Sequence, residues 1–248
     1  MAEQLRQRLS RAAKWLEELI FPQEVLCLGC GRAVGEDAAG GICPSCVEAL
    51  ARLRERQEAE EKAHPAREIP EGIAYVHAAF PYEGAAMQLI RRLKFESVRA
   101  AAIPLAEEMA YLDAGEEELI VPVPTDERRR RQRGFNQSTL LAAHMAKRLG
   151  MPMAEALRRT QRRAPQRGLN AAQRKKNLLG CMAASEAVSG KRVLLVDDVC
   201  TTGATLREAA RALLAAGAAG VGVFTAARAA RAADEPRDPF AAGEILRK

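Results

Sequence analysis

The stretch VLLVDDVCTTGATL, residues 193–206, constrains the fold more than any other part of the chain. Its first four residues are apolar and predict a buried strand, which the adjacent carboxylates of Asp197 and Asp198 are expected to close. A loop of small residues follows, and a helical pattern begins at about residue 204. A buried strand that leads through a short loop into a helix is typical of α/β proteins.

The spacing of apolar residues predicts further strands and helices in alternation. Gly and Pro separate these segments, and Gly150 is expected to end one helix. The alternation predicts an α/β fold with a doubly wound, mainly parallel sheet. The expected strands are residues 73–82, 119–124, 153–160, 193–197 and 221–225, and the expected helices are residues 3–20, 47–62, 87–95, 135–149 and 204–216.

Four of the six cysteines form two Cys-x2-Cys pairs, Cys27 with Cys30 and Cys43 with Cys46. Two such pairs at this separation supply the four thiolates that a tetrahedral zinc site takes. Disulfides and a redox pair are the alternatives. The N-terminus carries no recognisable export signal, and a reducing compartment disfavours disulfides. We therefore expect a closed, structural Zn²⁺ site in a small N-terminal module.

The acidic pair and the small-residue loop fall where ligands bind in open α/β sheets, outside the carboxyl ends of the strands. Backbone N–H groups at a helix N-terminus and threonine hydroxyls can cradle a phosphate. The carboxylates would repel that phosphate, so they suit sugar hydroxyls or a divalent cation beside it. A ribose 5-phosphate fits both halves. The cradle residues are Thr201, Thr202, Gly203, Ala204 and Thr205.

Positive charge gathers in two segments of a chain whose formal net charge is +6. Residues 128–133 hold five arginines, and residues 157–185 hold eight basic residues and no acidic one. Arginine forks stabilise the negative charge that grows on a departing pyrophosphate. For any single arginine, a solvated basic surface is the alternative.

Together these motifs resemble the ComF/GntX-like competence protein family, which is type I phosphoribosyltransferase-like and carries an N-terminal zinc-binding motif of four cysteines. Residues 193–206 resemble the loop that binds phosphoribosyl pyrophosphate (PRPP). The resemblance covers nearly the whole chain. It is carried further by FPQEVLCLGCG with CPSC, PYEGAAMQLIRRLKF, VPVPTDERRRRQRGFNQ, QRGLNAAQRKKNL and the terminal TAAR.

The resemblance implies the type I phosphoribosyltransferase fold and a role for each site residue. Asp197 and Asp198 would be the catalytic pair on the ribose hydroxyls, and residues 201–205 would hold the 5-phosphate. Lys94 and Arg128 would contact PRPP, which binds with Mg²⁺. The irregular segment after residue 160 would form a mobile lid. Candidates for the lid and the pyrophosphate end are Arg133, Arg158, Arg167 and Arg174.

Three regions are expected along the chain. Residues 1–62 comprise an N-terminal helix and the four-Cys zinc module. Residues 63–118 comprise a linker and a hood region, and residues 119–248 comprise the phosphoribosyltransferase-like core. A chain of 248 residues is long enough for one α/β domain with a small appendage.

The resemblance implies a phosphoribosyltransferase, a glycosyltransferase that moves phosphoribosyl from PRPP to an unidentified acceptor with release of pyrophosphate. Natural transformation and DNA uptake would be its setting. The alternative is a non-catalytic competence factor that binds single-stranded DNA through the DNA backbone and also binds competence-machinery proteins, with PRPP as a regulatory ligand.

Few aromatic residues are available to stack on bases, since they make up 4% of the chain. Phe135, which follows the arginine run, is the one platform that we single out for stacking. No run of eighteen apolar residues occurs, so we expect no membrane insertion and a cytoplasmic location.

Overall fold

A four-stranded parallel sheet lies at the centre of the computed structural model, which describes residues 25–34, 41–63, 69–160 and 180–229. In the strand order β3-β8-β7-β4, the strand that comes first in the chain, β3, pairs with the strand that comes last, β8. The predicted α/β fold with a mainly parallel sheet is therefore confirmed. The strands are β3 (Tyr75–Pro81), β4 (Leu119–Pro122), β7 (Arg192–Cys200) and β8 (Gly220–Arg228).

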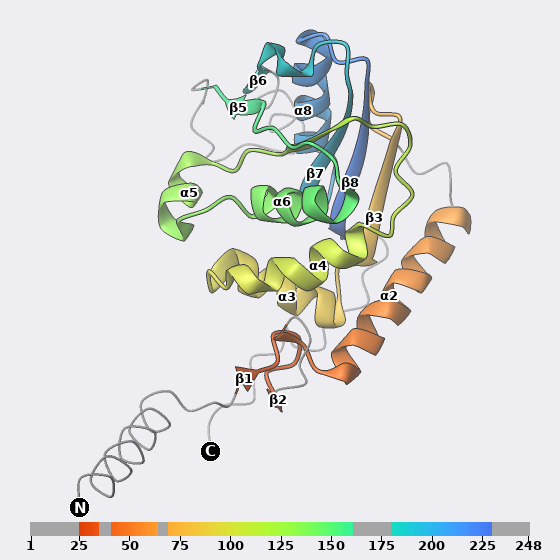
Figure 1. Cartoon of the computed structure of the whole chain (residues 1–248), viewed down its shortest axis with the longest axis vertical. Helices are drawn as coiled ribbons and strands as arrows, with labels where there is room; N and C mark the ends of the chain where they lie inside the picture. Colours follow the sequence, from red (N-terminus) through yellow and green to blue (C-terminus); the bar gives the residue numbers. More distant parts are fainter. Residues whose placement is uncertain (1–24, 35–40, 64–68, 161–179, 230–248) are drawn as a thin grey trace, which may run out of the picture.

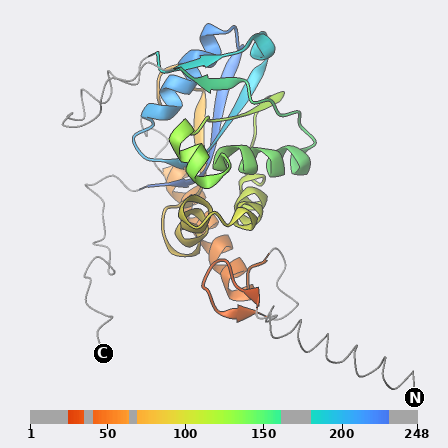
Figure 2. The same cartoon turned by 90° about the vertical axis from the view of Figure 1, so that its left-hand side faces the viewer.

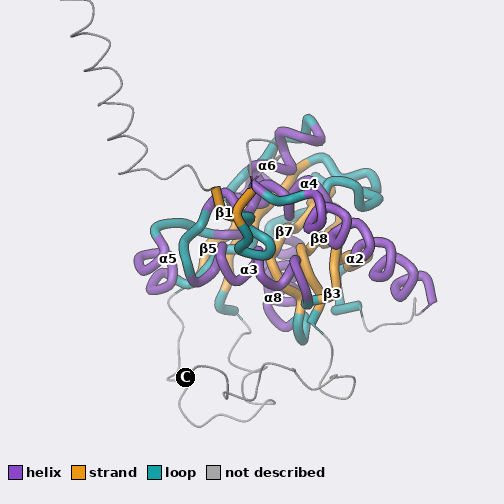
Figure 3. Tube along the Cα trace, turned by 90° about the horizontal axis from the view of Figure 1, so that it is seen from below, coloured by secondary structure: helices purple, strands orange, loops and turns teal. Residues whose placement is uncertain are grey.

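Both faces of the sheet are buried, because successive side chains of a strand point to opposite sides. On β7, Val193 and Leu195 pack in the cluster formed with α8 (Ala204–Ala215). Leu194 and Val196 join the cluster on the other face. Figure 3 shows the same layers, with α8 on one side of β7 and β8 and the helices α4 and α6 on the other. The helices that contribute to this second cluster include α3 (Gly84–Phe95), α4 (Ala102–Met109) and α6 (Gln137–Leu149). The short helix α5 (Glu127–Arg133) precedes α6 and has no buried residue.

Local sequence signals explain where α6 begins and ends. The Asn136 side chain accepts a hydrogen bond from the backbone N–H of Ser138, which caps the helix N-terminus. Gly150 adopts a left-handed conformation with φ of 66° and ends the helix, as predicted. The first residues of α6 are thereby held beside the carboxyl-terminal half of β7.

The four cysteines lie in a small module at one end of the molecule (Figures 1 and 2). The short strands β1 (Val25–Leu26) and β2 (Ala33–Val34) pair in an antiparallel manner, and α2 (Pro44–Ala63) runs from the module along the edge strand β3. Near its end, Glu61 accepts a hydrogen bond from the backbone N–H of Ala78 at 3.1 Å. Polar contacts therefore attach the far end of α2 to the sheet.

Several element boundaries differ from the predictions. The strand expected at 193–197 extends to Cys200, so the prediction that the acidic pair closes this strand was wrong. The backbone ladder continues because β8 is also longer than expected and pairs Val199 with Ala227. A short antiparallel pair, β5 (Leu157–Arg159) with β6 (Met182–Ala184), lies beside α8. The helix expected at 3–20 lies outside the described residues.

No helix in the described ranges is both long and apolar enough to cross a bilayer.

Candidate active site

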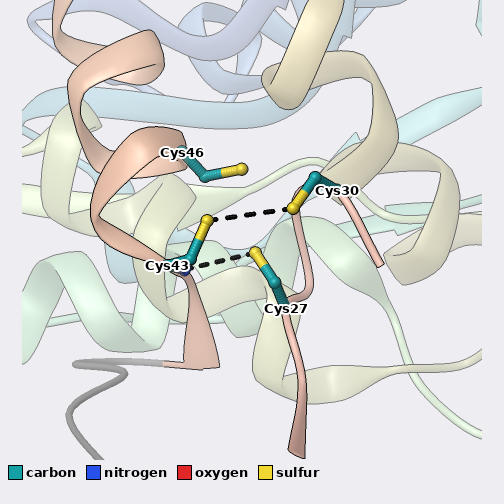
Figure 4. Close-up of side chains that lie close together, drawn as sticks. All are labelled: Cys27, Cys30, Cys43 and Cys46. Carbon is teal, nitrogen blue, oxygen red and sulfur yellow. Dashed lines mark hydrogen bonds between the residues drawn. The ribbon is translucent and has the colours of Figure 1, made fainter. Parts of the chain in front are cut away.

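The four sulfur atoms of Cys27, Cys30, Cys43 and Cys46 converge in the N-terminal module (Figure 4). All four Sγ atoms lie within 4.8 Å of one another, and those of Cys30 and Cys43 are 3.8 Å apart. A tetrahedral site with zinc–sulfur bonds of about 2.3 Å places its sulfur atoms about 3.8 Å apart. The cluster can therefore hold a metal ion such as zinc, in agreement with the predicted ligand set.

Hydrogen bonds favour the thiolate form of two of the four cysteines, Cys27 and Cys30. Burial opposes the charged form of Cys27, yet N–H donors that include those of Cys43 and Gly29 lower its pKa overall. The Arg32 side chain, with its Nε 3.4 Å from the sulfur, lowers the pKa of Cys30 to about 6. Gly29 is required by close packing, because a Cβ there would lie 2.7 Å from Cys46 Sγ. These donors thus favour the thiolates of Cys27 and Cys30, whereas burial and the neighbouring cysteines raise the pKa of Cys46.

A second site lies at the carboxyl ends of β4 and β7, where a cavity of about 520 Å³ opens. The volume falls within the range of small-molecule sites. Charged and polar side chains dominate its walls, and four segments of the chain contribute them. The charged and polar residues of the lining, together with one aromatic residue, include Lys94, Phe95, Arg129, Arg133, Gln137, Ser138, Arg159, Asp197, Asp198 and Thr205.

The two carboxylates of the cavity are held by different helices. Ser138 at the start of α6 donates to Asp197 Oδ1 at 2.8 Å. Lys94 at the end of α3 places its Nζ 2.8 Å from Asp198 Oδ1. Burial, and then the charge of Asp198, raise the pKa of Asp197 to about 7. These separate partners explain how two adjacent acids are accommodated in one strand.

Three polar atoms in this cavity are buried and have no hydrogen-bond partner within the described part of the chain: Asp198 Oδ2, Gln137 Oε1 and Arg133 Nη1. A buried polar group left unpaired costs about 1–3 kcal/mol. Burial and the neighbouring charge of Arg129 lower the pKa of Arg133. The cavity therefore offers both acceptors and a cationic donor to a polar ligand.

Sequence comparisons place these features in a family. A phosphoribosyl transferase domain model matches residues 136–244. The chain is 43% identical to the DNA utilization protein YhgH of Escherichia coli over 110 residues, which are 44% of this chain and 48% of that protein. It is 40% identical to competence protein F of Haemophilus influenzae over 118 residues, 45% of this chain and 51% of that protein. These matches span about half the length of each relative.

A longer match covers most of the chain. In an alignment of 225 positions that covers 85% of this chain and 87% of the relative, the chain is 28% identical to competence protein ComFC of Bacillus subtilis. The chain belongs to the ComF-like phosphoribosyltransferase family. The four-Cys cluster and the parallel sheet agree with that assignment.

In this ComF-like chain, the structure brings together only some of the site residues named from the sequence. Lys94, Arg133, Asp197, Asp198 and Thr205 line the one cavity described above. The preceding loop residues do not line it: Thr201 and Thr202 are exposed, Gly203 is buried and Ala204 begins α8. Arg128 lies on α5 outside the cavity, Arg158 is exposed on β5, and Arg167 and Arg174 lie outside the described residues.

Other lining residues were not singled out from the sequence. Arg159 enters the cavity wall while Arg158 is exposed, as the alternation of a strand requires. Ser138 could have been noticed as a hydroxyl at the start of a helix that follows the strand at 119–124. Phe135 is 8% exposed and the Arg99 guanidinium lies 5.1 Å from its ring centroid, so the expectation that it offers a stacking platform was wrong.

Proposed function

We propose that this ComF-like chain binds PRPP with Mg²⁺ and transfers its phosphoribosyl group to an acceptor, releasing pyrophosphate. The unpaired Oδ2 of Asp198 carries this proposal. A buried carboxylate oxygen with no protein donor suits a ligand hydroxyl, and a ribose provides two of them side by side. Asp197 lies next to it with its Oδ1 already fixed by Ser138.

Residues around the acidic pair suit the two ends of PRPP, the 5-phosphate and the pyrophosphate. The N-terminus of α8, beginning at Ala204 after the loop of Thr201 and Thr202, suits the 5-phosphate. Lys94, Arg133 and Arg159 line the same cavity and suit the pyrophosphate, whose charge grows as its bond to the sugar breaks. Arginines of the segment after residue 160, including Arg167 and Arg174, would add to this charge in the proposed lid.

The proposal includes two metal ions: Mg²⁺, which would bind together with PRPP, and Zn²⁺, which would have a structural role. The carboxylate oxygens of Asp197 and Asp198 fit Mg²⁺, which would partly neutralise the pyrophosphate when it binds with the substrate. The four thiolates of the N-terminal module would hold a structural Zn²⁺ with no open position. The protein side chains themselves orient the sugar and stabilise charge, since the reaction demands little else of them.

Calorimetric titration with PRPP and Mg²⁺ tests the proposal. We expect wild type to bind, and the double variant Asp197→Asn/Asp198→Asn to bind at least about 100-fold more weakly, because each lost charged acceptor costs about 1.5–3 kcal/mol. Asp113→Asn is the matched control, since Asp113 is exposed and absent from the cavity walls. Equal affinities in the double variant and wild type would exclude this binding mode.

Transfer is tested separately by pyrophosphate release. Adding a cell extract that contains acceptors should release pyrophosphate from PRPP with wild type and not with the double variant. Binding without any release would instead leave PRPP as a regulatory ligand of a non-catalytic protein.

A second candidate function is a competence factor that handles single-stranded DNA in the cytoplasm and binds other proteins of the uptake machinery. The helix α5 favours it, because five of its seven residues are arginines and none of the seven is buried. The names of the E. coli, H. influenzae and B. subtilis relatives point in the same direction. Such binding would use phosphates, so affinity should fall steeply with salt and be insensitive to base sequence.

DNA retention by the double variant separates the two functions. Salt-sensitive retention that is unchanged in Asp197→Asn/Asp198→Asn favours the DNA-binding factor. Retention lost on changing Arg128, Arg130 and Arg131 to glutamine would assign the contact to α5.

A further inference from the structure

Glu208 on α8 is 2% exposed, yet it does not line the cavity that holds the acidic pair. Carboxylates are rarely buried in proteins unless they are paired. Here Arg211 supplies the pair, with its Nε 2.8 Å from Glu208 Oε2 and its Nη2 2.8 Å from Oε1. Burial opposes the charged form, but these donors and the N–H of Met182 hold the pKa of Glu208 below its ordinary value. A buried position of α8 thus carries a charge that packing alone does not require.

The Glu208–Arg211 pair binds the backbone of β6. The N–H of Met182 donates to Glu208 Oε1 at 3.1 Å, and Arg211 Nη2 donates to the carbonyl oxygen of Met182 at 3.3 Å. Figure 1 shows β5 and β6 side by side next to α8, in agreement with the contacts between β6 and that helix. Two side chains of one helix turn therefore hold both backbone polar groups of a single strand residue.

The strand pair held in this way carries Arg159 into the cavity. Arg159 is the register partner of Met182, lines the cavity and donates through Nε to the carbonyl oxygen of Pro124 at 2.9 Å. Both β5 and β6 have only three residues. An isolated pair of short strands is marginally stable at best. The bonds from α8 therefore supply a hold that the short ladder lacks.

The same helix reaches the other end of the proposed substrate. Helix α8 begins at Ala204, directly after the loop that suits the 5-phosphate, and Glu208 lies about one helical turn further on. One rigid element thus connects that loop to the strand pair that bears Arg159.

We propose that Glu208 and Arg211 are positioning residues, which hold β6 and through it keep Arg159 in place at the pyrophosphate end of the cavity. The inference rests on the proposed function, since that function assigns Arg159 to the pyrophosphate. Replacing a buried ion pair by apolar residues of similar volume is often neutral or stabilising for a fold. What the charged pair adds is the pair of directional bonds to Met182.

A double-mutant cycle on the zinc-loaded full chain tests the positioning role. PRPP with Mg²⁺ is titrated calorimetrically into wild type, Glu208→Leu/Arg211→Met, Arg159→Gln and the combination of all three changes. If the pair acts through Arg159, its removal should matter only while Arg159 is present. We expect Glu208→Leu/Arg211→Met to weaken PRPP binding about fivefold in the wild-type background and less than about twofold in the Arg159→Gln background.

Arg54→Met/Glu108→Leu provides the matched control. Arg54 Nε lies 2.8 Å from Glu108 Oε2, and this pair joins α2 to α4 without lining the cavity. Both double variants therefore remove an arginine–glutamate pair, and only one of the pairs holds β6. The control should bind PRPP within about twofold of wild type.

A milder variant keeps the test decisive if the apolar pair does not fold, which its melting temperature would reveal. The Arg211 side chain is 43% exposed, so Arg211→Gln leaves little buried space unfilled. It should weaken PRPP binding about threefold alone and have no effect after Arg159→Gln.

Three results would overturn the positioning role: equal weakening with and without Arg159, no weakening in wild type, or no loss in Arg159→Gln itself. A control that loses as much affinity as the apolar pair would also overturn it. Failure of the proposed function is distinguished by the first titration, because wild type would then not bind PRPP, and the positioning role would fall with it.

Discussion

The four-Cys module brings four sulfur atoms together, and the acidic cavity brings two carboxylates together. Both arrangements are costly, but the two regions assemble them differently. The module assembles its ligands within residues 27–46 and surrounds them with N–H donors. The cavity draws its walls from segments near residues 95, 130, 159 and 200 and leaves three buried polar atoms without partners among the described residues.

We infer that the module suits a resident ion and that the cavity suits an exchanging ligand. Four thiolates whose sulfur atoms lie within 4.8 Å of one another can complete the coordination of one metal ion and leave no position open. Unpaired atoms such as Asp198 Oδ2 and Arg133 Nη1 can be satisfied only when something enters. The four predictions below test this contrast, beginning with the largest expected effect.

Replacing one thiolate should abolish the metal site. We expect Cys43→Ser to retain less than half an equivalent of zinc per chain, measured by metal analysis, and to lower the melting temperature by on the order of 10 °C, because zinc binding stabilises the module directly. Cys181→Ser is the control, since Cys181 lies outside the cluster. Full zinc content in the Cys43 variant would refute the four-thiolate site.

Crowding the module should weaken the site without removing a ligand. In Gly29→Ala the new Cβ would lie 2.7 Å from Cys46 Sγ, so that sulfur must move. Competition with a chelator should show zinc affinity reduced about tenfold or more. Gly220→Ala, whose Cβ would meet nothing closer than 4.0 Å, should leave the affinity unchanged.

Two neighbouring arginines should differ in their effect on the cavity. Arg159 lines the cavity and donates through Nε to the carbonyl oxygen of Pro124 at 2.9 Å, while Arg158 is exposed. We expect Arg159→Gln to weaken PRPP binding about tenfold and Arg158→Gln less than about twofold. Equal losses would indicate a general effect of positive charge.

The smallest effect concerns the cost of ionising Asp197, which is buried and lies next to Asp198. The pKa of Asp197 is raised to about 7, so between the ordinary carboxyl range and pH 7 the folded state binds more protons than the unfolded state. Stability should therefore fall as pH rises through this window and level off above it. Asp197→Asn should melt about 2–4 °C above wild type at pH 8.

That advantage should shrink as pH falls and disappear below about pH 4, once Asp197 is protonated in both the folded and the unfolded protein. Asp113→Asn should show no such pH-dependent difference from wild type. A gain for Asp197→Asn that is equal at pH 8 and at pH 4 would show that ionisation of buried Asp197 is not its cause.

Sequence patterns predicted the elements whose signals are local. The helix at 135–149 was found because Asn136 caps it and Gly150 ends it. The four-Cys cluster was predicted because two Cys-x2-Cys pairs define it in the sequence. The extent of β7 was missed, since polar residues up to Cys200 stay in the ladder only through pairing with β8. Helix α5 was missed as a helix because its arginines carry no apolar periodicity.

The sequence by itself determined an α/β fold with a mainly parallel sheet, a four-Cys cluster and an acidic pair near the carboxyl end of a strand. The signals for them are local: the periodicity of each segment, two Cys-x2-Cys pairs and two adjacent carboxylates. Only the tertiary structure decided that Lys94 meets Asp198, that Ser138 meets Asp197, and that Phe95 rather than Phe135 is open to a ligand. Those outcomes depend on how helices far apart in the chain pack on one sheet, and side-chain exposure is set by that packing.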